Sequence, residues 1–113
     1  MSTERLLHPD AARRWHTLTL MDQLAHVGSE VDRAIRANAA GNTRRFDGAL
    51  ARALELFDLT AADERWRGPR RREILRARSE FCRLFYETVA ADSAIGLSRY
   101  FLAFAIAARR TTA

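Results

Sequence analysis

Apolar residues recur at intervals of three and four positions along almost the whole chain after residue 19, and no segment alternates apolar and polar residues as a strand would. This period predicts amphipathic helices with one face turned inward. Four main helices are expected, over residues 19–40, 43–60, 70–91 and 94–110, with a short helical arm over residues 1–18. Short connections favour antiparallel neighbours, so the sequence predicts an all-α fold, an up-down four-helix bundle in one domain.

The expected helix boundaries follow from capping residues. Thr19, with Asp22 three residues later, is typical of a helix start, and Gly41 is typical of a helix end. Pro69 suits the first position of the third helix, because its missing N–H would be unpaired there anyway. Residues 92–93, Asp-Ser, are expected to end that helix.

The composition indicates a single domain with an excess of positive charge. The chain has 113 residues and a net charge of +5, and all 19 of its basic residues are arginine. A basic balance favours anionic partners such as nucleic acid or an acidic protein. Arginine suits forked phosphate contacts, but GC-rich coding would give the same composition without selection for binding. The composition leaves both explanations open.

Cysteine usage and hydropathy indicate a cytoplasmic protein. The single cysteine, Cys82, cannot form an internal disulfide, which fits a reducing compartment. The longest apolar run, residues 100–108, is nine residues long. A membrane span needs about 20. We therefore expect no membrane association.

No residue pattern names a reaction. The histidines, His8, His16 and His26, do not have the spacing of a metal site. Helical RNA nucleases of the HEPN type carry an arginine followed four to six residues later by a histidine, and no histidine here fits that spacing. Glycine-rich phosphate loops and a nucleophile elbow are also absent from the sequence. The sequence therefore predicts a protein that is not an enzyme, with no metal and no cofactor.

Seven arginines lie between residues 65 and 78, several of them where the third helix should begin. Cations at a helix N-terminus oppose the helix dipole, so this cluster predicts a functional surface. Free amides surrounded by guanidinium groups would bind phosphate, and a tryptophan could stack on a base. The residues expected to bind nucleic acid or another polyanion are Arg65, Trp66, Arg67, Arg70 and Arg71. Alternatively, these arginines pair with Asp58, Asp63 and Glu64, while Trp66 closes the end of the bundle.

Arg78 falls at the centre of the apolar face of the third helix on a helical wheel. A lone charge there would be costly, so we expect a buried ion pair, with Glu30 or Asp58 as the acid. The alternative is that Arg78 reaches a pocket or an interface.

The fourth helix is apolar nearly all round, so it must be covered on several sides. Burial against a second copy of the chain would explain this, with Leu97, Tyr100, Phe101 and Phe104 at the interface. The alternative is a centrally buried helix whose back is covered by the N-terminal arm.

Three segments, residues 29–34, 41–46 and 49–56, resemble the second and third helices of the 23S rRNA intervening-sequence proteins. That group of small prokaryotic four-helix bundles includes accessory proteins of diversity-generating retroelements. The resemblance implies a bundle that assembles into a basic ring and handles RNA or a reverse transcriptase. Residues 20–86 are more similar to small helical prokaryotic proteins of unknown function.

The sequence thus predicts a self-associating basic bundle that binds RNA or another polyanion. The alternative is an interaction module with an acidic protein partner and no nucleic acid.

Overall fold

The computed structural model describes residues 9–86 and 91–112, and these residues form an all-α fold. The elements are α1 (Pro9–Trp15), α2 (Leu20–Ala39), α3 (Thr43–Ala61), the 3-10 helix η1 (Glu64–Trp66), α4 (Pro69–Tyr86) and α5 (Ala91–Thr112). The predicted all-α class is confirmed, and the arrangement is consistent with the predicted four-helix bundle.

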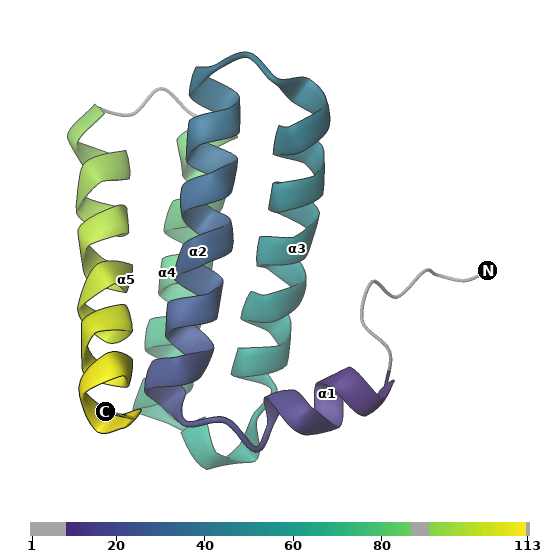
Figure 1. Cartoon of the computed structure of the whole chain (residues 1–113), viewed down its shortest axis with the longest axis vertical. Coiled ribbons are helices and arrows are strands. Elements are labelled where there is room, and N and C mark those ends of the chain that lie inside the picture. The colour runs from purple at the N-terminus through teal and green to yellow at the C-terminus, as the bar shows by residue number, and fades with distance from the viewer. Residues whose placement is uncertain (1–8, 87–90, 113) are drawn as a thin grey trace.

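The four long helices run alternately up and down, and α1 lies across the lower end of α3 as a short arm (Figure 1). Helix α2 packs most extensively on α3 and α5, while α4 lies against α3 and α5 with fewer contacts. The turn between α2 and α3 is at the opposite end of the bundle from the connection between α3 and α4 (Figure 1). Side chains on these two connections therefore belong to separate surfaces.

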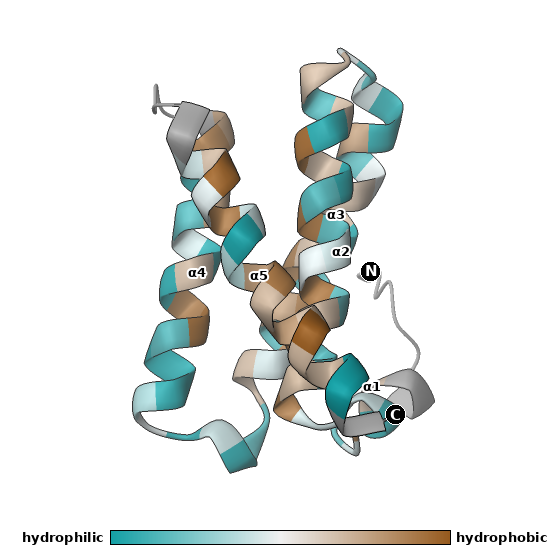
Figure 2. Ribbon diagram, turned by 60° about the vertical axis from the view of Figure 1, so that its left-hand side comes forward, coloured by the Kyte–Doolittle hydropathy of each residue, from teal (hydrophilic) through white to brown (hydrophobic). Residues whose placement is uncertain are grey.

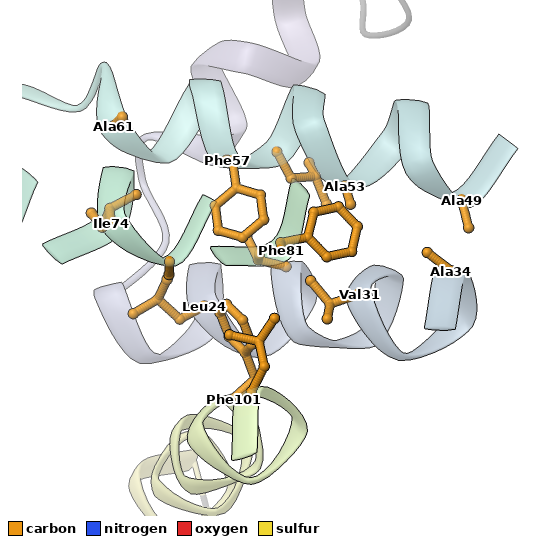
Figure 3. Packing of buried hydrophobic residues seen from close by; sticks show 14 of the residues in the cluster. Leu24, Val31, Ala34, Ala49, Ala53, Phe57, Ala61, Ile74, Phe81 and Phe101 are labelled. Atoms are coloured by element: carbon orange, nitrogen blue, oxygen red, sulfur yellow. The ribbon is translucent and has the colours of Figure 1, made fainter. Parts of the chain in front are cut away.

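The core is built around three phenylalanines, one from each of three helices. Phe57 of α3 has its ring centroid 5.8 Å from that of Phe81 of α4 and 5.9 Å from that of Phe101 of α5. Leu24 and Val31 of α2 close the cluster from the facing helix (Figure 3). All five side chains are almost fully buried. This layer holds the four helices together.

Gly28 allows α2 and α5 to approach closely. A Cβ atom at this position would lie 2.5 Å from Cβ of Phe101, which is well inside van der Waals contact. The glycine therefore fixes the separation of the two helices at the level of the phenylalanine cluster.

One expected boundary differs from the structure. The described part of α4 reaches Tyr86, residues 87–90 lie outside the described residues, and residues 92–93 fall in the first turn of α5 instead of before that helix. Asp and Ser favour the start of a helix as much as the stretch after one, so this pair marked the next helix. The predicted arm corresponds to α1, while residues 1–8 lie outside the described part.

Figure 2 colours the chain by hydropathy, and apolar segments recur along α5 on the side turned to the viewer.

No helix in the described ranges combines the length and apolarity that crossing a membrane requires. Within the same ranges, no three histidine, cysteine, aspartate or glutamate side chains gather as a metal ion would require.

Candidate polyanion-binding site

Arg65, predicted to bind a polyanion, is held in a structural ion pair. Its Nε and Nη2 donate to the two carboxylate oxygens of Asp63 at 3.0 and 2.7 Å, and Nη2 also donates to the Leu18 carbonyl at 2.7 Å. The Asp63 side chain is 4% exposed. Hydrogen bonds from Arg65 hold the pKa of Asp63 at about 2, below its usual 3.8, although burial opposes the shift. Arg65 thus joins the α1–α2 turn to the α3–α4 connection.

Trp66, expected to stack on a base, closes the end of the bundle. Its indole N–H donates to Oε1 of Gln23 at 2.7 Å, and Gln23 has no exposed surface. Nε2 of Gln23 donates to the Trp15 carbonyl at 2.8 Å and to Asp63 at 3.1 Å. Trp15 extends the network to α3, because its indole N–H donates to Thr60 at 3.1 Å. The arrangement agrees with the alternative in which the tryptophan seals the bundle.

Arg71 caps the C-terminus of α3. Its Nε donates to the Ala61 carbonyl at 2.6 Å, where the last carbonyls of a helix lack intrahelical partners. Arg67 pairs with Glu64, and Nη1 of Arg70 lies 3.9 Å from Glu73. Both of these pairs are exposed, so their ionic contacts are weak. The predicted site required unpaired guanidinium groups, and the structure places Arg65 and Arg71 in structural contacts instead.

Arg78 has the predicted acid Asp58 as its partner but not the predicted burial. Its Nε donates to Oδ1 of Asp58 at 3.0 Å, and the two side chains are 33% and 63% exposed. The second expected acid, Glu30, is on α2 and pairs with other arginines. Arg78 is long enough to carry its charge from the edge of the apolar face out to solvent.

The predicted oligomer residues contribute to the chain's own bundle. Leu97 and Phe101 of α5 are buried in the core, whereas Tyr100 and Phe104 are half-buried against it. Burial, together with the negative charge of Glu73, raises the pKa of Tyr100 to about 12. Leu97 and Phe101 are therefore unavailable to a partner, because the core of the same chain already covers them.

A basic groove lies at the other end of the bundle, along one side of the α2–α3 hairpin. We call it the α2–α3 groove. Its volume is about 840 Å³. The residues that line it are Arg33, Arg36, Ala37, Ala40, Asn42, Arg44, Arg45, Gly48, Ala49 and Arg52. Five of the ten are arginine and none is acidic.

Small side chains make the hollow between the two helices. Ala34 of α2 and Ala49 of α3 lie near one another at this end of the helix pair (Figure 3), and Gly48 has no neighbouring atom within 4 Å of the place of a Cβ. Asn42 caps α3 by accepting a hydrogen bond from the Arg45 backbone N–H at 3.1 Å. The cap fixes where the first turn of α3, with its two arginines, begins.

Arg36, Arg44 and Arg45, here called the hairpin arginines, are exposed. In residues 9–86 and 91–112, none of their guanidinium groups has a hydrogen bond or an ion pair. Helix α3 has no acidic residue in its first turn, and the dipole at its N-terminus is opposed by the C-terminus of α2 at the same end, so the positive charge here comes from the arginines. This end of the hairpin carries charge that the fold leaves uncompensated.

Sequence reasoning missed this groove because its arginines are spread over residues 33–52. The signal was present in a weaker form, since arginines stand on both sides of the Gly41 turn. Gly41 adopts a φ of 71°, which glycine reaches without strain, and the chain reverses there. The reversal brings side chains from both helices to one surface.

Comparison with protein-family models, with curated proteins and with solved structures finds no match to this chain, and the resemblance to the 23S rRNA intervening-sequence proteins stays a prediction.

Proposed function

We propose that the protein is a cytoplasmic, non-enzymatic helical bundle that binds RNA in the α2–α3 groove. The observation that carries the proposal is the set of hairpin arginines, whose guanidinium groups have no partner in the described part of the chain. Arginine binds phosphate through two parallel N–H groups, and neutralising phosphates releases counterions from the nucleic acid. Three unpaired cations on one concave surface suit such a ligand.

The lining of the groove favours a phosphate backbone over an acidic protein. Protein interfaces commonly depend on large aromatic anchors, such as tryptophan and tyrosine, that fill complementary pockets. Apart from glycine, the apolar residues that line this groove are all alanine. A protein partner would find charge there without an apolar anchor, whereas a phosphate chain needs only the charge.

Binding is tested by fluorescence anisotropy with a mixed single-stranded RNA at low salt. Replacing the three hairpin arginines by alanine should weaken binding about 100-fold, since each lost charged contact is worth roughly 1 kcal/mol. Unlabelled poly-glutamate serves as the competitor that represents an acidic protein surface. The proposal fails if the wild-type protein does not bind RNA, or if poly-glutamate competes as well as RNA at equal charge.

We also propose that the chain self-associates, through the outward side of α5. Support comes from Ile95, Leu102 and Ile106, which are 52%, 52% and 41% exposed and lie on one side of the helix. Exposed apolar patches on soluble proteins often mark interaction sites. Light scattering should give a mass above 12.8 kDa, and a Leu102→Glu change should lower it without unfolding the chain. A wild-type mass equal to that of one chain would refute self-association.

A further inference from the structure

An acidic side chain contacts two of the arginines that line the α2–α3 groove. Glu30 of α2 is 10% exposed, and its two oxygens contact arginines of two different helices. Oε2 accepts a hydrogen bond from Nη1 of Arg33 at 2.9 Å, and Oε1 lies 3.4 Å from Nε of Arg52 on α3. Both arginines also line the groove.

We infer that Glu30 is a positioning residue that holds Arg33 and Arg52 in the lining of the α2–α3 groove, oriented for phosphate. The inference rests on the proposed function and adds to it how two of the five arginines are arranged. One carboxylate fixes two long side chains that would otherwise sample many rotamers. Fixing them before the ligand arrives reduces the entropy lost on binding.

The two arginines remain able to bind a ligand while they contact Glu30. Their side chains are 66% and 55% exposed. A guanidinium group has five N–H donors, and Arg33 uses one of them on Glu30. The contact of Arg52 is an ion pair without a hydrogen bond, because Oε1 of Glu30 has no hydrogen-bond partner in the described residues. Most of the donors of both groups are therefore available to phosphate oxygens.

The direction in which a Glu30 substitution changes RNA affinity tests the inference. If the groove bound RNA by net charge alone, removing a negative charge next to it would strengthen binding. If Glu30 positions the arginines, the Glu30→Gln change should weaken binding about tenfold, since two side chains must then be ordered by the ligand. The two explanations thus give opposite signs for the same substitution.

The test measures RNA affinity by anisotropy for Glu30→Gln, Glu30→Asp and the control Glu55→Gln, each checked for folding by circular dichroism. Glu30→Asp keeps the charge but withdraws the carboxylate, so it should also weaken binding. Glu55 lies on α3 outside the groove, and its substitution makes the same change of charge as Glu30→Gln. The control should bind as tightly as the wild type or slightly more tightly.

A positioning role also requires that the effect of Glu30 depends on the two arginines. In a chain that carries Arg33→Ala and Arg52→Ala, Glu30→Gln should no longer weaken binding. The inference is overturned if Glu30→Gln and Glu30→Asp bind like the wild type or more tightly, or if Glu30→Gln weakens binding equally without the two arginines. Absence of RNA binding by the wild type would instead refute the proposed function.

Discussion

The Asp63→Asn substitution would test the polar network at the base of the bundle. Asparagine has the shape of aspartate but cannot carry its charge. The change removes the ion pair with Arg65, whose guanidinium contacts both carboxylate oxygens. Because the Asp63 side chain is almost fully buried, solvent screens this interaction little. The substitution should therefore destabilise the fold at neutral pH.

The size of the effect follows from the pKa of Asp63. The folded state holds this pKa at about 2, compared with 3.8 for the solvated carboxyl group of an unfolded chain. The difference corresponds to about 2 kcal/mol of stability. A depressed carboxyl pKa stabilises the fold above the unfolded-state pKa, and that contribution is lost as the pH falls through the folded-state pKa. About half of it should remain at pH 3.

Urea unfolding followed by circular dichroism at pH 7 and pH 3 measures this contribution. Asp63→Asn should lower the free energy of unfolding by about 2 kcal/mol at pH 7 and by about half as much at pH 3. Glu64→Gln, which removes an exposed pair with Arg67, is the control and should cost less than about 1 kcal/mol. An equal loss for Asp63→Asn at both pH values, or no loss at pH 7, would refute the assigned role of the ion pair.

Three further substitutions compare buried with exposed positions, and urea unfolding measures the effect of each. Gly28→Ala should cost about 1–3 kcal/mol, because its new methyl group meets Phe101, whereas Gly48→Ala meets no neighbour and should be neutral or stabilising. A harmless Gly28→Ala would contradict the close approach of α2 and α5. Arg78→Met should cost less than about 1 kcal/mol, because its pair with Asp58 is solvated, and a loss of about 3 kcal/mol or more would indicate a buried pair.

The apolar period was sufficient to predict the all-α class. Each stripe must face a core, and the phenylalanines of three helices meet there as the period requires. The break at residues 92–93 could not be placed in this way. Asp and Ser are common both just before a helix and just after one. The structure shows that here they belong to the first turn of α5.

The polyanion site was harder to predict, because local sequence does not show which charges are already paired. The arginines around Trp66 are dense in sequence, yet Asp63 and a helix C-terminus occupy two of them. The hairpin arginines are sparse in sequence and become one surface only through the reversal at Gly41. Arginine density alone therefore could not show that two of the arginines in the dense segment are held in structural contacts.

The dependence of RNA affinity on salt tests the central claim most directly. Two variants that lose the same charge are compared: one lacks the hairpin arginines, and the other lacks the α4 arginines, Arg70, Arg72 and Arg76. Helix α4 begins at the end of the bundle opposite the α2–α3 turn (Figure 1). Each phosphate contact contributes about 0.7 to the slope of log K against log salt on a single strand. Loss of the hairpin arginines should flatten the slope by about 2, while loss of the α4 arginines should leave it nearly unchanged. Equal flattening by both variants would contradict a binding site in the α2–α3 groove.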